Sequence, residues 1–212
     1  MIKAIIFDCW NTLFYTDINP HPFSIFAERI GKSIYDYEFL KVFEKHFMLK
    51  KHYDIEVPMK GLLNELNIKF SKELINDLKD IYQKTFDSQK AYPETLKVLN
   101  ELKSNYKLGL ITNTEYQGVE MLEEKFNISR IFNIILKSYE TGILKPDSKV
   151  FEIMLKRLNV KKNEAIMVGD NLKDDVEAAE KVGIKGILID RKNKHLDYKD
   201  RINSLEQLNK FL

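Results

Sequence analysis

Short apolar runs recur along most of the chain and are bounded by turn residues. Five of them, rich in Ile, Val and Leu, cover residues 4–7, 108–111, 131–136, 165–168 and 184–189. Most positions within each run are apolar, whereas a strand with one wet face would show an apolar residue only at every second position. The pattern therefore predicts strands of a parallel sheet that is covered on both faces.

Stretches with helical periodicity lie between these runs. The first, residues 93–103, has a proline in its first turn and places Leu96, Leu99 and Leu102 on one stripe. Three further helices are expected over residues 115–126, 147–158 and 172–182. Alternating strands and helices predict an α/β fold with a doubly wound, Rossmann-like parallel sheet.

Residues 15–90 interrupt this alternation with a purely helical pattern. One amphipathic helix carries Phe39 and Phe43 on its apolar face and has Asp36 as its expected N-cap. A second amphipathic helix begins after Ser71. Shorter helical pieces are expected over residues 23–30 and 58–66.

This helical stretch divides the chain into two predicted domains. The α/β core consists of residues 1–14 and 91–212, and the inserted all-α domain consists of residues 15–90. Because the insertion directly follows the first strand, it is expected to lie over the carboxyl end of that strand.

Composition and charge narrow the class of protein. Hydrophobic residues make up 44% of the 212 and charged residues 31%, as in a folded globular protein. The 34 basic and 32 acidic side chains nearly cancel to a net charge of +2, which argues against nucleic acid or an anionic membrane surface as partner. No apolar run approaches the roughly 18 residues of a membrane span, and Asp8 ends the first run too early for a signal peptide. The single cysteine, Cys9, excludes an internal disulfide and a paired-cysteine metal site, so a cytoplasmic protein is expected.

Polar side chains with catalytic potential follow the predicted strands. In an open α/β sheet, ligands bind at the carboxyl ends of the strands. The side chains expected there are the carboxylates of Asp8, Asp170, Asp174 and Asp175 and the groups of Thr12, Thr112, Asn113 and Lys145. Carboxylates with few other ligands suit Mg²⁺, while hydroxyls, backbone N–H groups and a lysine near a helix start suit phosphate oxygens.

In their order these residues resemble the motifs of the haloacid dehalogenase (HAD) superfamily. The first motif of that family, a strand followed by Asp-x-Asp-x-Thr, is matched by Asp8 and Thr12. The second, a Thr or Ser after a strand, is matched by Thr112, and the third, a lysine, by Lys145. The resemblance implies an α/β hydrolase core.

The fourth motif and the insertion extend the resemblance over the whole chain. Gly-Asp followed by a further aspartate is matched by Gly169 and Asp170, with Asp174 and Asp175 four and five residues on. The helices of residues 15–90 are similar to the helical cap domain of that family.

The resemblance implies a role for each matched residue. Asp8 would be the nucleophile that forms an aspartyl-phosphate, and Thr112 and Lys145 would hold the transferred phosphoryl group. Asp8, the backbone carbonyl of Trp10 and Asp170 would bind Mg²⁺.

Supporting roles follow in the same way. Thr12, Trp10 and Asn113 are candidates for substrate contact, and Asp174 or Asp175 would orient the lysine or metal-bound water. The alternative for these two acids is a solvated first turn stabilised by the helix dipole. The expected partner is a small phosphorylated molecule, whose identity no motif encodes.

Trp10 departs from the family pattern. The family has an aspartate there that acts as general acid and base, whereas an indole donates a hydrogen bond but does not titrate. Losing a positioned general acid costs about 10²–10⁴ in rate, so a slow phosphatase that prefers good leaving groups is expected. Trp10 itself would be a stacking surface for substrate, a plug of the site or packing between domains.

Two other functions remain open at this point. An aromatic residue in the first motif is similar to the L-2-haloacid dehalogenases, in which displaced halide needs no proton. The retained Asp170, Phe151 in place of a tyrosine of that branch, and Arg29 as the single arginine of the insertion argue against it. The remaining alternative is a catalytically dormant HAD scaffold that binds metal and a ligand or a protein.

Two further features are interpreted as structural. The four histidines, His21 among them, have no metal-ligand spacing and are expected on the surface or in packing. The mixed charges of residues 191–201 indicate a solvated loop before a final helix.

Overall fold

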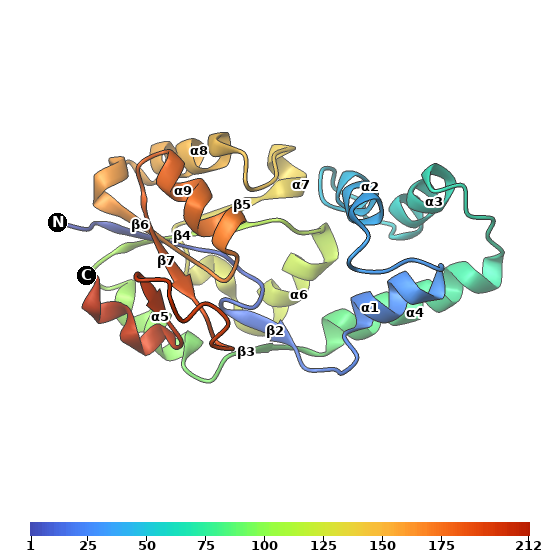
Figure 1. The fold of residues 1–212 in the computed structure, drawn as a ribbon, viewed down its shortest axis with the longest axis horizontal. Coiled ribbons are helices and arrows are strands. Elements are labelled where there is room, and N and C mark those ends of the chain that lie inside the picture. The colour runs from blue at the N-terminus through green and yellow to red at the C-terminus, as the bar shows by residue number, and fades with distance from the viewer.

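A six-stranded parallel sheet forms the centre of the structure, a computed structural model that describes residues 1–212 (Figure 1). The strands lie in the order β5-β4-β1-β6-β7-β8. Their bounds are β1 (Ala4–Phe7), β4 (Lys107–Thr112), β5 (Ile134–Lys137), β6 (Ala165–Gly169), β7 (Lys185–Ile189) and β8 (Arg201–Ile202). Since β1 lies between β4 and β6, the carboxyl ends of these three strands meet at one edge of the sheet.

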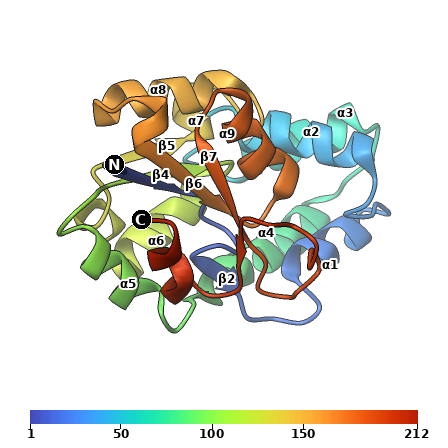
Figure 2. The ribbon, with the colours of Figure 1, turned by 60° about the vertical axis from the view of Figure 1, so that its left-hand side comes forward.

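Helices cover both faces of the sheet. The helices of this α/β core are α5 (Thr95–Leu102), α6 (Tyr116–Phe126), η1 (Ile128–Arg130), α7 (Ser138–Thr141), α8 (Ser148–Leu158), η2 (Lys162–Glu164), η3 (Leu172–Glu177), α9 (Ala178–Lys181) and η4 (Leu205–Lys210). Figure 2 shows α8 and α9 on one side of the sheet and α5 and α6 on the other.

Alternate residues of β1 enter the two layers. Ile5 and Phe7 pack with α5, α6 and η4, while Ala4 and Ile6 pack with α8 and α9. All four side chains are fully buried, as expected for a strand covered on both faces. The predicted doubly wound α/β fold is confirmed.

Four helices form a separate unit at the end of the molecule opposite to both termini (Figure 1). This helical unit consists of α1 (Pro22–Arg29), α2 (Tyr37–Phe47), α3 (Glu56–Glu65) and α4 (Lys72–Asp87). It has its own core of 14 buried residues, including Phe43 and Phe47, whose rings stack with centroids 4.3 Å apart. Asp36 and Ser71 cap α2 and α4 as expected, each accepting a hydrogen bond from a first-turn N–H group. None of the helices in the structure combines the length and the apolar character needed to cross a membrane.

A two-stranded antiparallel ribbon joins the helical unit to the core. Strand β2 (Phe14–Thr16) pairs with β3 (Gln89–Ala91), a pairing that the sequence pattern does not predict. Tyr15 and Lys90, the expected limits of the inserted domain, lie directly opposite each other in this ribbon. The chain therefore leaves and re-enters the core at neighbouring points.

Helix α6 of the core holds the helical unit by hydrogen bonds. The Gln117 side chain donates to the carbonyl of His52 at 2.9 Å. The Lys125 ammonium donates to the carbonyls of Phe86 and Asp87 at 2.8 and 2.9 Å. The unit is thus fixed to the core by non-covalent contacts as well as by the ribbon.

Three details differ from the sequence-based expectations. Leu96 is exposed, because α5 turns Val98 towards the core in its place. The helix expected over residues 172–182 is divided into a π-helical turn, η3, and the short α9. Residues 191–201 are not uniformly solvated, since the Arg191 side chain is only 13% exposed and the last residue begins β8.

Replacing Phe47 by alanine is expected to destabilise the helical unit. Phe47 packs against Phe26, Phe43 and Tyr82, so truncation leaves a cavity that costs about 3–5 kcal/mol. Urea unfolding measures the loss. The control is Tyr37→Ala in the same helix, which is exposed and should change stability by no more than about 0.5 kcal/mol. Equal unfolding midpoints for the two variants would contradict a packed core in this unit.

Candidate active site

The side chain of Lys145 lies between two carboxylates at the carboxyl edge of the sheet. Its Nζ donates to Asp8 Oδ1 at 2.5 Å and to Asp175 Oδ1 at 2.6 Å. The three side chains are buried. Burial opposes the charge of Lys145, but the carboxylates of Asp175 and Asp8 together raise its pKa above the ordinary value. Lys145 is therefore a fixed cation at this edge.

The backbone after β6 brings Asp175 against the end of that strand. A Cβ at Gly169 would overlap the Asp175 side chain, so this close approach requires a glycine. Asn171 caps η3, its side chain accepting from the N–H groups of Lys173 and Asp174. The Asn171 N–H in turn donates to Asp175 Oδ2 at 3.1 Å. Both oxygens of Asp175 thus have a partner.

Asp170 completes a cluster of three carboxylates. One oxygen from each of Asp8, Asp170 and Asp175 lies within 4.8 Å of the others. Burial, followed by repulsion from Asp8, raises the pKa of Asp170 well above its ordinary range. One lysine faces three carboxylates, so a cation between Asp8 and Asp170 would relieve the repulsion. Because carboxylate oxygens are the ligands that Mg²⁺ prefers, these residues fit a magnesium ion.

Asp174 lies outside this cluster. Its Oδ2 accepts from the Asn171 side chain at 2.9 Å, and burial raises its pKa. Asp175, one residue on, is the acid that contacts Lys145. Of the two acids named by the sequence motif, the structure brings only Asp175 to the lysine.

Asn113, just beyond β4, holds the backbone of Lys145. Its amide donates to the Lys145 carbonyl at 3.0 Å and accepts from the Lys145 N–H at 2.8 Å. Asn113 therefore has a positioning contact that the sequence motif does not reveal.

The hydroxyls of Thr112 and Thr12 are both buried without a hydrogen-bond partner.

Arg191 supports the loop that follows β1. Its guanidinium donates to the Thr12 carbonyl at 2.7 Å and to Glu94 at 2.8 Å, and it lies 3.5 Å from the centre of the Tyr92 ring. The sequence places Arg191 in a run of mixed charge that looks solvated, and no local pattern distinguishes it from its exposed neighbours.

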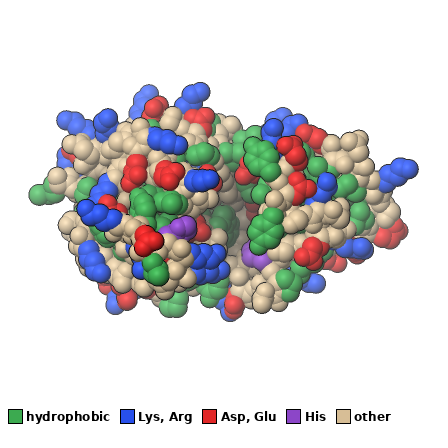
Figure 3. Space-filling view, in the orientation of Figure 1, with side chains coloured by type: hydrophobic (Ala, Val, Ile, Leu, Met, Phe, Trp, Pro, Cys, Tyr) green, Lys and Arg blue, Asp and Glu red, His purple; other side chains and the backbone are tan.

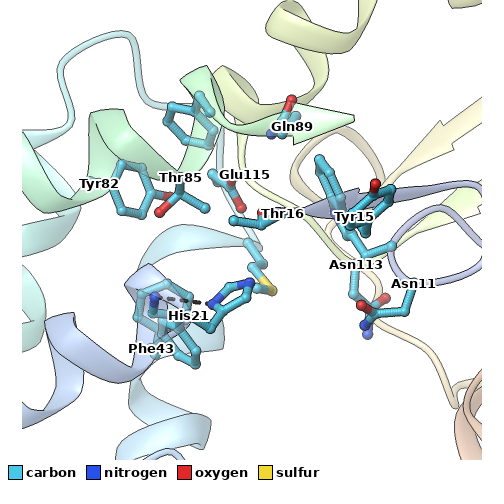
Figure 4. A pocket seen from close by; sticks show the side chains of 14 residues that line it. Asn11, Tyr15, Thr16, His21, Phe43, Tyr82, Thr85, Gln89, Asn113 and Glu115 are labelled. Atoms are coloured by element: carbon cyan, nitrogen blue, oxygen red, sulfur yellow. Dashed lines mark hydrogen bonds between the residues drawn. The ribbon is translucent and has the colours of Figure 1, made fainter. Parts of the chain in front are cut away.

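A pocket of about 240 Å³ lies between the core and the helical unit. Figure 3 shows the molecule hollowed between its two parts, with hydrophobic side chains on the wall formed by the helical unit. Figure 4 shows the lining side chains, of which the labelled ones are Asn11, Tyr15, Thr16, His21, Phe43, Tyr82, Thr85, Gln89, Asn113 and Glu115. Trp10 also lines the pocket, and its Nε1 donates to Thr114 Oγ1 at 3.4 Å. The Trp10 side chain, on the loop that begins with Asp8, therefore shares this pocket with residues of the helical unit.

Two titratable residues of the pocket have no counterpart in the motifs. Burial raises the pKa of Glu115 from 4.5 to about 7. His21 accepts from the Phe23 N–H at its Nδ1 at 3.1 Å, and burial lowers its pKa. A single glutamate before a helix resembles any solvated acid, so the sequence carries no signal that Glu115 lines a pocket.

The sequence matches a known family over most of its length. Residues 30–189 match the model described as haloacid dehalogenase-like hydrolase. This range begins after Asp8 and Thr12 and includes Thr112, Lys145 and Asp170. The match therefore does not depend on the unusual first motif.

Named relatives are phosphatases. The glyceraldehyde 3-phosphate phosphatase of Pyrococcus abyssi is 30% identical over 194 residues, which cover 88% of this chain and 81% of that protein. The phosphatase of the same name from Methanocaldococcus jannaschii is 35% identical over 126 residues, 55% of this chain and 54% of that protein. The chain spans about half the length of this and several other curated relatives that it matches.

Solved structures share the fold. A HAD phosphatase from Thermococcus onnurineus superposes with a TM-score of 0.68 and 23% identity, covering 99% of this chain and 97% of that chain. A 2-haloacid dehalogenase from Pseudomonas syringae pv. Tomato gives a TM-score of 0.67 and 22% identity with the same coverage. The fold alone therefore does not distinguish ester hydrolysis from halide displacement.

Replacing Glu115 by glutamine is expected to change how stability depends on pH. Since folding raises the pKa of Glu115, the unfolded chain ionises first, and the wild type loses stability as pH rises from about 4.5 to about 7. Glu115→Gln removes this loss and should be about 1–3 kcal/mol more stable than the wild type at pH 8 but nearly equal at pH 4.5. Urea unfolding at both pH values measures the difference.

Glu124→Gln is the matched control for this experiment. Glu124 is exposed on α6, the helix that begins directly after Glu115, so its variant should follow the wild-type curve. A constant difference between Glu115→Gln and the wild type at both pH values would contradict a raised pKa.

Proposed function

The chain belongs to the haloacid dehalogenase-like hydrolases, and on this premise we propose that it is a Mg²⁺-dependent phosphatase of small phosphate esters. The observation that carries the proposal is the Lys145 ammonium between Asp8 and Asp175, beside the carboxylate of Asp170. Phosphoryl transfer to a carboxylate needs positive charge beside both groups, because nucleophile and phosphate repel each other. The name of the relative from Pyrococcus abyssi supports the same reaction class.

Asp8, the backbone carbonyl of Trp10 and Asp170 are proposed to hold the Mg²⁺ ion. When bound, the ion would offset the charges of the phosphate and the carboxylates and polarise the phosphoryl oxygens. Asp175 is proposed to orient Lys145, with which it already shares a hydrogen bond. Asp174 does not contact Lys145, and its proposed role is to hold the side chain of Asn171, from which it accepts a hydrogen bond.

Asp8 is the proposed nucleophile. Its carboxylate oxygen forms a bond to phosphorus while the ester P–O bond breaks and its electron pair leaves with the alcohol oxygen. Lys145 and the unpartnered hydroxyl of Thr112 are suited to donate hydrogen bonds to the phosphoryl oxygens. Water then attacks phosphorus in the aspartyl-phosphate, which releases inorganic phosphate and restores the Asp8 carboxylate.

The departing alcohol oxygen requires a proton, and Trp10 has none to give at neutral pH. Its indole N–H is also already directed to Thr114. We therefore propose that alkyl esters turn over slowly and that esters with acidic alcohols are favoured. Trp10 and Asn113, which line the pocket, are proposed to contact the leaving group, and Thr12 to shape the loop through its carbonyl contact with Arg191.

The inserted domain, residues 15–90, is proposed to act as a cap over the reacting groups. Its helices α1, α2 and α4 supply one wall of the pocket, and the loops after β1 and β4 supply the other. A cap of this kind excludes water from the site and contacts the leaving group.

Halide displacement from a 2-haloacid is less well supported than ester hydrolysis. Such a substrate carries a carboxylate, yet no lysine or arginine lines the pocket. Arg29, the single arginine of the helical unit, pairs with Asp77 on the exposed surface. Phe151, at the position of a tyrosine in that branch, is fully buried in the core.

Asp8→Asn is expected to abolish hydrolysis of p-nitrophenyl phosphate. Loss of the nucleophile should lower the Mg²⁺-dependent rate by at least about 10³-fold, and EDTA should lower the wild-type rate to a similar level. Asp80→Asn, at an exposed acid of α4, is the control and should keep the wild-type rate.

Each alternative function predicts a different experimental outcome. Equal rates for the wild type and Asp8→Asn, with Mg²⁺ still bound, would replace the proposal with a dormant scaffold. Halide release from 2-chloropropionate that persists in EDTA would replace it with a dehalogenase.

Trp10→Asp is expected to raise turnover of alkyl phosphates. A carboxyl at this position supplies the missing acid, so hydrolysis of glycerol 2-phosphate should increase by about 10-fold or more. Hydrolysis of p-nitrophenyl phosphate should change little, because p-nitrophenolate leaves without a proton. Trp10→Asn is the matched control, since it also removes the indole but provides no acid, and an equal gain in this variant would contradict the explanation.

A further inference from the structure

The pocket between the core and the helical unit has a lining that would favour some leaving groups over others, an inference that rests on the proposed function. Asn113 lines the pocket and also bonds to the backbone of Lys145, so pocket and lysine lie on either side of this residue. Trp10 also lines the pocket and is only two residues after Asp8 along the chain. A second cleft lies beside Asp170 and is lined by Arg191, Lys192 and Lys194, but no residue of the helical unit lines it. The alcohol part of an ester held under the helical unit, with its phosphate at Asp8 and Lys145, would extend into the first pocket.

The charge of the pocket is unfavourable to an anionic group. No lysine or arginine is among the lining residues, whereas Glu115 is. No cation lies close enough to Glu115 to lower its pKa. His21 is disfavoured as a cation by burial and by the nearby Lys192, which itself does not line the pocket. Above about pH 7, where Glu115 is ionised, a leaving group with a carboxylate or a second phosphate would therefore meet a negative charge in this pocket and no positive charge among the lining residues.

The walls of the pocket suit a leaving group with an apolar face. Half of the 14 lining residues are hydrophobic. Rings of Phe43 and Tyr82, shown in Figure 4, come from the helical unit, and the indole of Trp10 comes from the core. Apolar and aromatic surfaces on opposite sides favour a flat or aliphatic group between them.

The same pocket contains hydrogen-bonding atoms without partners. The Oε1 of Gln89 and the hydroxyl of Tyr82 are buried and form no hydrogen bond within the protein. The carboxylate of Glu115 adds a stronger acceptor. The Tyr82 hydroxyl can donate or accept, whereas the oxygens of Gln89 and Glu115 only accept, so these two oxygens favour a ligand that carries hydrogen-bond donors.

We propose that the pocket selects phosphate esters whose leaving group has no negative charge, has an apolar face and donates a hydrogen bond to Glu115. Hydroxyl-bearing and amine-bearing alcohols meet this description. Bisphosphates, phosphorylated carboxylic acids and inorganic pyrophosphate do not.

Two matched aryl esters test this rule. 4-(Hydroxymethyl)phenyl phosphate and 4-(carboxymethyl)phenyl phosphate have the same ring and similar phenol acidity, and they differ in charge and in donor capacity. For the Mg²⁺-loaded wild type at pH 8, where Glu115 is ionised, kcat/KM should be at least about 10-fold higher for the hydroxymethyl ester. An equal or higher value for the carboxymethyl ester would overturn the inference while leaving the proposed phosphatase intact.

Variants of Glu115 assign the preference to that side chain. Glu115→Gln should raise kcat/KM for the carboxymethyl ester by about 3–10-fold, and Glu115→Lys should reverse the preference. Glu124→Gln, the exposed control on α6, should keep the wild-type ratio. Activity on the hydroxymethyl ester shows that each variant is folded.

Two outcomes separate the failure of the inference from that of the function. An unchanged ratio in a Glu115→Gln enzyme that still hydrolyses both esters would overturn the assignment to Glu115. Loss of all Asp8-dependent hydrolysis in the wild type would overturn the proposed function, and the inference with it.

Discussion

The buried ammonium of Lys145 is the interaction on which the rest of the site depends. A buried lysine keeps its charge only when carboxylates or other acceptors compensate it, and here Asp8 and Asp175 come from segments 137 and 30 residues away along the chain. Asp8 follows β1 and Asp175 follows β6, the neighbouring strand, whereas Lys145 lies beyond β5 and its backbone is held by Asn113 at the end of β4. The sheet order and the ion pairs therefore support each other, and Asp170 adds a third carboxylate to the cluster.

Much of the fold could be predicted because burial leaves a direct pattern in the sequence. Continuous apolar runs located five of the six strands of the sheet, all but the two-residue β8, and side-chain capping by Asp36 and Ser71 located two helix starts. The ribbon of β2 and β3 could not be predicted, since each strand has three residues and the pairing joins positions more than seventy residues apart. The division of the last expected helix into η3 and α9 also escaped the pattern, because residues 172–182 show ordinary helical periodicity throughout.

The polar cluster at the strand ends could be predicted from the sequence, whereas the pocket beside it could not. Topology alone requires polar residues at strand ends to meet, so Asp8, Asp170 and Lys145 could be named from the sequence. The residues of the pocket, such as Glu115 and His21, depend on how the helical unit is oriented on α6. That orientation follows from hydrogen bonds to backbone carbonyls, which carry no side-chain signature, and so the pocket became visible only in the structure.

The ribbon has a consequence for how such a protein can change its specificity. The chain enters the helical unit at Thr16 and returns at Gln89, and these two residues are paired across one ladder. The whole helical unit is connected to the β2–β3 ribbon as the loop of a hairpin would be. The length and sequence of the unit are therefore free to vary as long as Thr16 and Gln89 remain adjacent. A different set of helices, or a much shorter loop, could be exchanged at this point without moving Asp8 or Lys145. The carboxylate–lysine cluster and the wall that the helical unit contributes to the pocket are in this sense independent modules of one chain.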